Sequence, residues 1–175
     1  MRELSDDALS KKTDEFRSRL AEGTPLNHLL PEAYAVICEV NRRVLGMSPY
    51  DCQILGGIAL HYGYLAEMNT GEGKTLTATM PLYLNALTGK STILVTANDY
   101  LADRDAQEMG PIYAFLGMTV CSIGNIGRSG QGNEEKRRLY QADIVYTTHA
   151  ALGFDYMLNN LVTNAKDRFM REFYY

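Results

Sequence analysis

The stretch that decides the fold is Met68-Asn69-Thr70-Gly71-Glu72-Gly73-Lys74-Thr75. An apolar run at residues 64–68 leads into it and predicts a strand, and residues 76–87 follow it with a pattern that predicts a helix. In a glycine-rich loop between a strand and a helix, backbone N–H groups surround a phosphate at the positive end of the helix. The sequence therefore predicts a phosphate-binding loop at this position.

The residue types in this loop suit a nucleoside phosphate and Mg²⁺. Gly71 and Gly73 permit backbone angles at which successive N–H groups turn toward phosphate oxygens. Lys74 supplies a positive charge for the β- and γ-phosphates, and the Thr75 hydroxyl is a ligand for Mg²⁺. A chance match is the alternative, which the flanking strand and helix disfavour. The predicted contacts to ATP or ADP are Thr70, Gly71, Glu72, Gly73, Lys74 and Thr75.

Short apolar runs recur downstream of the loop at nearly equal intervals. They lie at residues 92–96, 119–123 and 143–147, with helical stretches between them, and residues 171–175 open a fifth run. Strands that alternate with helices in this way are typical of βα units in a parallel sheet. We therefore expect an open α/β sheet with flanking helices.

Two helices are predicted before the loop. The first begins after Ser5, an N-cap residue followed by two acids, and ends at Gly23. The second begins with Pro31 at its first position and ends at Gly46. Their apolar stripes are Leu9, Phe16 and Leu20 in the first helix, and Tyr34, Ile37, Cys38, Asn41, Val44 and Leu45 in the second.

Glycine and proline mark further boundaries. Gly89 ends the helix after the phosphate loop, and the pair Gly110 and Pro111 is expected to interrupt a later helix. Residues 124–133 contain four glycines and predict a surface loop before a helix that begins near Glu134. These glycines lack the helix start of a phosphate loop, so we do not expect phosphate to bind there.

Composition narrows the classes of function. The formal net charge of the 175 residues is −4, which gives no overall attraction to nucleic acid. No apolar run approaches the about 20 residues that span a bilayer, and the first residues are polar, so a cytoplasmic location is expected. The spacing of Cys38, Cys52 and Cys121 predicts reduced thiols, and His61 and His149 are expected to be structural.

Longer segments extend the pattern beyond the loop. They are PYDCQILGG at 49–57, AEMNTGEGKT at 66–75, YLNALTGK at 83–90, NDYLADRDAQEMGPIYAFLGMTV at 98–120 and LGFDYMLNN at 152–160. From Ser5 to about Leu161 the chain resembles the first nucleotide-binding domain of SecA, the ATPase that drives preproteins through the SecY channel. The resemblance implies a P-loop NTPase fold of the RecA-like, helicase-superfamily kind, in which Met68 is tolerated at the first glycine position.

The resemblance also implies an adenine site and a domain division. Gln53 stands where a glutamine reads adenine in this family, and Tyr50 is placed to border the base. Alternatively, Tyr50 covers the apolar base of the helix at 51–60. Residues 1–48 would form an N-terminal helical segment packed on the motor domain, and 49–175 a partial nucleotide-binding domain.

Two further segments match motor motifs. Residues 96–104 and 147–156 correspond to motifs that belong to the coupling machinery in SecA and contact nucleic acid in helicases. The alternative for Asp99, Asp103, Arg104 and Asp105 is a solvated helix start, with the acids near the N-terminus, where they interact favourably with the helix dipole.

Relative to the family, the sequence is expected to stop before the strand that carries the Walker B acids and to lack the N-terminal membrane-binding segment. The chain alone is therefore expected to have neither ATPase nor translocase activity, and its open sheet edge beside the P-loop strand to permit self-association. The resemblance implies the SecY complex, preproteins and an anionic membrane surface as partners of the intact protein, at the inner face of the bacterial plasma membrane.

Two other functions remain open from the sequence. A helicase-superfamily motor would share the phosphate loop, although NDYLADRD at 98–105 and the acidic balance disfavour a nucleic-acid partner. A module that binds nucleotide or a partner without catalysis is the other alternative.

Overall fold

The computed structural model describes residues 1–123 and 133–175 and confirms an α/β fold with a parallel sheet and flanking helices. The chain forms two compact units, residues 1–88 with 111–117 and residues 89–110 with 118–175. Most of the loop predicted at 124–133 lies outside the described residues. The predicted division at residue 48 stays a prediction.

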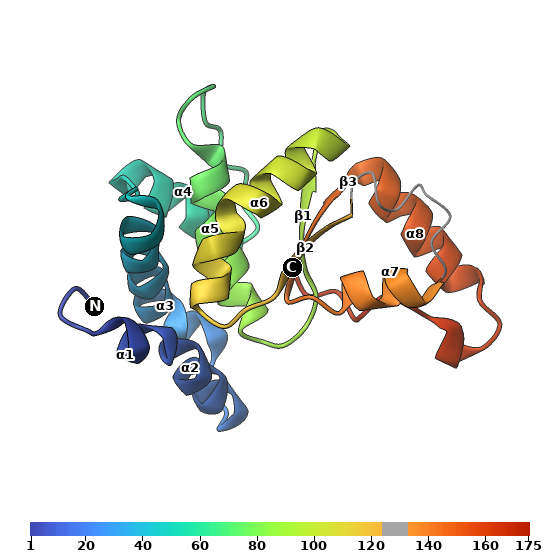
Figure 1. Ribbon diagram of the computed structural model, residues 1–175, viewed down its shortest axis with the longest axis horizontal. Coiled ribbons are helices and arrows are strands. Elements are labelled where there is room, and N and C mark those ends of the chain that lie inside the picture. Colours follow the sequence, from blue (N-terminus) through green and yellow to red (C-terminus); the bar gives the residue numbers. More distant parts are fainter. Residues whose placement is uncertain (124–132) are drawn as a thin grey trace. The chain divides into compact units, whose positions relative to one another are not determined.

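Helices make up the first unit, and the phosphate-loop helix is at its centre (Figure 1). Helix α5 packs against α3 and α4, and its Met80 and Leu84 are fully buried. The hydroxyls of Thr13 and Tyr83 share a buried hydrogen bond of 3.1 Å, which joins α2 to α5. The helices are α1 (Asp6–Ser10), α2 (Lys12–Ala21), α3 (Leu26–Val40), the π-helical turn η1 (Asn41–Leu45), α4 (Asp51–His61) and α5 (Lys74–Ala86).

The N-terminal helices differ in detail from those predicted. Ser5 does cap α1, since its hydroxyl accepts the N–H of Ala8 at 3.2 Å, but α1 and α2 are separate helices that meet at Lys11. The placement of Pro31 was wrong, because it lies inside α3. Pro25, with extended backbone angles, stands before that helix instead. Two prolines in the same stretch each offered a helix start, and the earlier one is used.

Glu39 lies at the end of α3 under two arginines. Its carboxylate is only 5% exposed and accepts hydrogen bonds from Arg42 at 2.7 Å and from Arg43 at 2.7 Å. Arg43 also donates to the carbonyl oxygen of Leu4 at 2.8 Å and to Asp6 at 2.7 Å, which fastens the N-terminal segment to α3. These bonds, led by those from Arg42, lower the pKa of Glu39 to about 2.

The Glu39 cluster predicts acid sensitivity. A folded-state pKa of about 2 against an ordinary value of 4.5 means that this stabilisation is present above about pH 4.5 and is lost as the pH falls toward 2. We expect the Tm of the protein to fall over this window and the Tm of Glu39→Gln to fall less. Calorimetric scans at several pH values check it, and parallel curves for the two proteins would contradict it.

The second unit contains the sheet. Strands β1 (Thr92–Thr96), β2 (Val120–Ile123) and β3 (Ile144–Thr148) are parallel in the order β1-β3-β2, so β3, buried along its whole length, is central (Figure 1). All three strands were predicted to within one residue. The remaining elements are α6 (Asp99–Phe115), which continues into the first unit, α7 (Asn133–Tyr140), α8 (His149–Leu161) and the 3-10 turn η3 (Ala165–Asp167).

Two predicted features are wrong. Residues 64–68 form no strand, and their side chains are largely exposed, with Leu65 94% exposed, because no strand in the described ranges pairs with them. Helix α6 runs through Pro111 without a break. Gly110 has no Cβ to clash with the proline ring, which removes one steric cost at this position. Pro31 and Pro81 also lie inside helices, α3 and α5.

The end of the chain lies beside β1, where the fifth apolar run predicted the start of a strand, and forms an isolated parallel bridge between Ser91 and Phe173. Ser91 donates its N–H to Glu172 at 3.1 Å and accepts that of Tyr174 at 3.0 Å, and Ile93 donates to Tyr175 at 2.8 Å. These bonds cover the start of β1. Self-association through an open sheet edge stays a prediction.

Candidate functional site

The phosphate loop has the backbone that its glycines predict. Gly71 and Gly73 have φ angles of +88° and +81°, in the left-handed region that favours glycine. Gly73 is the N-cap of α5 and, as a glycine, has no side chain with which to cap the helix. The N–H groups of the first turn of α5 therefore remain available to an anion, at the positive end of a helix of 13 residues.

Lys74 and Asn69 close the loop across its base. The Lys74 ammonium donates to the carbonyl oxygen of Asn69 at 2.8 Å, and its side chain is exposed. Thr75 follows in the first turn of α5, where its hydroxyl belongs to the same end of the helix. Thr70, Gly71 and Glu72 are exposed, so the predicted phosphate-binding residues lie together at the surface.

Asn69 is a site residue that the sequence reasoning missed. Its backbone N–H and its side-chain amide donate to the Glu72 carboxylate at 2.7 and 3.0 Å. These two bonds are the main reason that the pKa of Glu72 is lowered. The spacing Asn-x-x-Glu, which resembles a capping box, was the available signal.

Gln53 lies against the loop and has both ends of its amide engaged. It is 5% exposed. Its oxygen accepts the N–H of Tyr50 at 2.9 Å, and its NH₂ group donates to the carbonyl oxygen of Glu72 at 2.8 Å. A Cβ on Gly73 would lie 2.3 Å from the same NH₂ group. Gln53 therefore supports the loop, while its predicted reading of adenine remains a prediction.

Tyr50 precedes α4 with its ring 74% exposed. A ring that is so exposed covers little apolar surface, which disfavours the alternative in which it shields the base of the helix. Its use against adenine stays a prediction.

Close packing fixes the helix of Gln53 against the helix of Lys74. A Cβ on Gly57 in α4 would lie 3.3 Å from the carbonyl oxygen of Thr77 in α5, and Tyr34 of α3 donates to the Gly57 carbonyl at 2.8 Å. His61 contacts Asn85 at 3.0 Å and Asn27 at 2.9 Å, and burial lowers its pKa. Its contacts agree with the structural role expected of it.

The segment at 96–104 begins α6 in the second unit. Asn98 caps the helix by accepting the N–H of Leu101 at 2.9 Å. Asp103 accepts the Ser122 hydroxyl at 2.5 Å, and Asp105, 7% exposed, pairs with Arg104. A purely solvated helix start therefore does not describe these acids.

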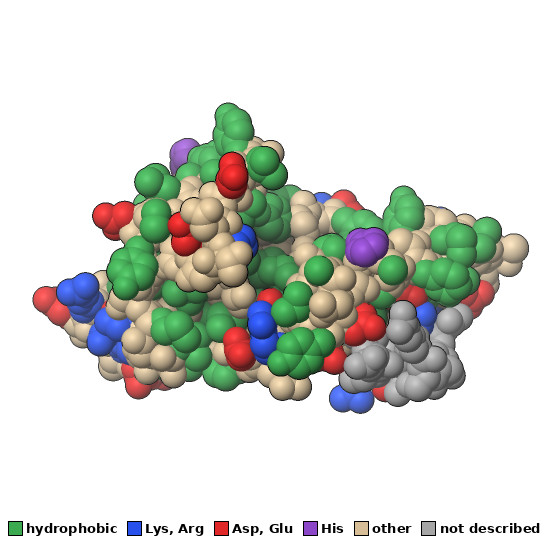
Figure 2. All heavy atoms as spheres, turned by 90° about the horizontal axis from the view of Figure 1, so that it is seen from above, with side chains coloured by type: hydrophobic (Ala, Val, Ile, Leu, Met, Phe, Trp, Pro, Cys, Tyr) green, Lys and Arg blue, Asp and Glu red, His purple; other side chains and the backbone are tan. Residues whose placement is uncertain are grey.

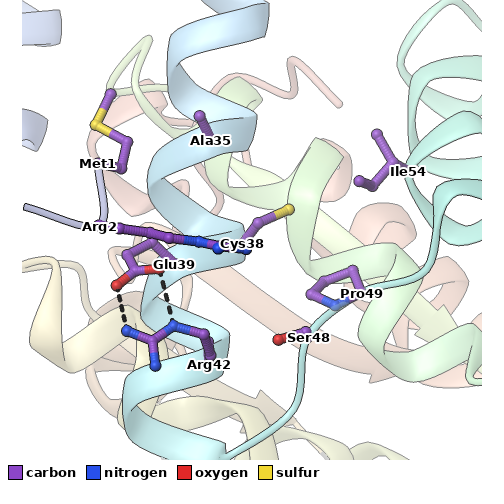
Figure 3. A pocket seen from close by; sticks show the side chains of 9 residues that line it. All are labelled: Met1, Arg2, Ala35, Cys38, Glu39, Arg42, Ser48, Pro49 and Ile54. Atoms are coloured by element: carbon purple, nitrogen blue, oxygen red, sulfur yellow. Dashed lines mark hydrogen bonds and ion pairs between the residues drawn. The ribbon is translucent and has the colours of Figure 1, made fainter.

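A pocket of about 320 Å³ lies apart from the loop, between α3 and the start of α4 (Figure 3). Cys38, Pro49 and Ile54 line it, and the Arg42 side chain at its rim is paired with Glu39. Burial raises the pKa of the Cys38 thiol to about 11, so this thiol is poorly reactive. All three cysteines are free, as predicted.

The surface shows mixed charge. On the face seen in Figure 2, basic side chains are scattered among acidic ones and do not gather in one area. Within residues 1–123 and 133–175, no helix combines the length and the apolar character that a membrane span requires.

Comparison with known proteins adds the family. The model of the SecA DEAD-like domain matches residues 1–175. Protein translocase subunit SecA 2 of Streptococcus gordonii is 61% identical over 176 residues, which is 100% of this chain and 22% of the relative. SecA 2 of Staphylococcus aureus (strain MSSA476) is 55% identical over 178 residues, and SecA of Rubrobacter xylanophilus 54% over 175, again across 100% of this chain but 22% and 19% of the relatives. The chain thus spans about a fifth of these relatives, and it belongs to the SecA DEAD-like domain family.

Proposed function

We propose that this chain binds ATP and ADP with Mg²⁺ as the nucleotide-binding part of a SecA-type motor ATPase. The observation that carries the proposal is the start of α5. Its N-cap is Gly73, and the left-handed Gly71 and Gly73 and the exposed Lys74 surround it. This arrangement fits the phosphates of a nucleotide, because N–H groups, a helix dipole and an ammonium group converge there.

Each loop residue has a role in this proposal. The N–H groups of residues 71–75 hold the phosphates, Lys74 neutralises the β- and γ-phosphates, and the Thr75 hydroxyl is a ligand for Mg²⁺. Gln53 holds the loop through Glu72, and Tyr50 presents its exposed ring to the base.

The activity of the whole protein is also a proposal, since the relatives are about five times longer. Their names as protein translocase subunits support a motor that couples ATP hydrolysis to the passage of preproteins through the SecY channel. Such a motor would act from the cytoplasm at the inner face of the plasma membrane, where anionic lipids are a further partner.

By themselves, we expect these 175 residues to bind nucleotide without appreciable turnover. Hydrolysis in P-loop motors needs a residue that orients the attacking water and a cation at the γ-phosphate. The loop's own carboxylate, that of Glu72, is turned to Asn69 and is not free for this task. ATP turnover above that of Lys74→Ala would contradict the expectation.

Calorimetric titration with Mg²⁺ and ADP tests the proposal. We expect Lys74→Ala to weaken binding about 10- to 100-fold, the value of a charged hydrogen bond to phosphate. Lys90→Ala removes the same charge from an exposed site in the second unit and should bind as the parent does. Binding that is equal in all three proteins, or absent from the parent, would reject the proposal.

A further inference from the structure

An acidic residue in a phosphate loop poses an electrostatic problem. Glu72 lies between the two loop glycines, and a free carboxylate there would repel an incoming phosphate. In the structure, the Glu72 carboxylate instead accepts two hydrogen bonds from Asn69.

Four interactions converge on Asn69. Its N–H and side-chain amide donate to the Glu72 carboxylate at 2.7 and 3.0 Å. Its carbonyl oxygen accepts the Lys74 ammonium at 2.8 Å and the N–H of Glu72 at 3.3 Å. The reciprocal contacts of Asn69 and Glu72 close a four-residue turn in the manner of a capping box.

Residue 72 is thereby held on two sides. Gln53 binds its carbonyl oxygen from α4, and Asn69 binds its carboxylate from the start of the loop. On either side of residue 72, Gly71 and Gly73 have left-handed backbone angles. A loop that is fixed in this way loses less conformational entropy when a ligand binds than a loose one does.

We propose that Asn69 and Glu72 are positioning residues that hold the loop in its phosphate-receptive shape before the ligand arrives. The inference rests on the proposed nucleotide-binding function. Its ligand is the diphosphate or triphosphate group, whatever the base, because the bonds of Asn69 and Glu72 fix the shape of the loop itself.

If Glu72 only repelled phosphate, its removal would change the affinity for phosphate in the opposite direction. If Glu72 acted through its negative charge alone, its removal would tighten phosphate binding. If it positions the loop, its removal weakens binding, and by the same factor for a nucleotide and for pyrophosphate.

Calorimetry with Mg²⁺ and either ADP or pyrophosphate separates the two roles. We expect Glu72→Ala to weaken both ligands about tenfold, and Glu72→Gln to weaken them less, since an amide oxygen still accepts one N–H. Glu67→Ala removes a charge from an exposed position just before the loop and should not weaken binding. Equal or tighter binding by Glu72→Ala would overturn the proposal.

A second measurement needs no ligand. In the nucleotide-free protein, we expect the NMR signal of the Asn69 backbone amide to move as the Glu72 carboxylate takes up a proton, with a midpoint below the ordinary glutamate value of 4.5. In Glu72→Gln the movement disappears. An Asn69 amide that does not respond to pH in the parent would overturn the positioning role even if nucleotide binds. If no ligand binds but the Asn69 amide signal still follows the protonation of Glu72, the nucleotide function is rejected, while the contact between Asn69 and Glu72 is confirmed.

Discussion

Gly73→Ala is expected to weaken the binding of Mg²⁺ and ADP by about 100-fold or more, because two costs add at this position. A side chain at a φ of +81° costs about 1–2 kcal/mol. The new Cβ would also lie 2.3 Å from the NH₂ group of Gln53, which must move and lose its bond to Glu72. A loop that relaxes away from this strain no longer presents its N–H groups to phosphate.

Gly71→Ala is the matched control. Gly71 has a similar φ of +88°, but a Cβ there meets nothing within 4 Å. It carries the conformational cost without the collision, so we expect about tenfold weaker binding. Titration calorimetry of the two variants measures the difference, and circular dichroism checks that both remain folded. Equal losses in both would show that contact with Gln53 does not matter.

Asp155→Ala is expected to destabilise the second unit by about 3–5 kcal/mol. Asp155 is 3% exposed, and its carboxylate accepts the Lys136 ammonium at 2.5 Å and the Tyr140 hydroxyl at 3.0 Å. These contacts join α7 to α8. Removal of the carboxylate leaves a largely buried ammonium group without its counter-charge, which costs more than the pair itself contributes.

Urea unfolding of three variants tests the origin of this effect. Tyr140→Phe removes one neutral donor and should cost about 1 kcal/mol. The double variant Lys136→Met with Asp155→Leu removes both charges, and we expect it to be far closer to the parent than Asp155→Ala is. A cost below about 1 kcal/mol for Asp155→Ala would mean that Lys136 finds water or another partner without difficulty.

The fold was predictable where local pattern and burial agree. Residues 92–96 are a strand in sequence and structure alike, and β3 is buried throughout. Residues 64–68 carry the same kind of apolar run but lie largely exposed. A strand forms only where another strand pairs with it, and a short apolar run does not indicate whether such a partner exists. Helix α6 continues through Pro111, as α3 and α5 do through Pro31 and Pro81, so the position of a proline does not locate a helix end in this fold.

The site was predictable in its outline and not in its internal bonds. The loop, its two glycines and Lys74 follow from spacing alone. The engagement of Gln53 with Glu72, across 19 residues of sequence, depends on how α4 packs on α5 and leaves no periodic signal. Asn69 is not one of the residue types of the phosphate-loop motif, and its contacts with Glu72 depend on the three-dimensional shape of the loop.

The bond from Gln53 to the carbonyl oxygen of Glu72 has a consequence for measuring selectivity between adenine and guanine nucleotides. If Gln53 also reads the purine as proposed, it contributes to affinity in two ways, and weaker ADP binding by a Gln53 variant combines both contributions. Only the ratio of adenine to guanine nucleotide affinities, compared between parent and variant, isolates recognition of the base. An unchanged ratio with lower affinity for both would mark Gln53 as a support of the loop that does not discriminate between purines.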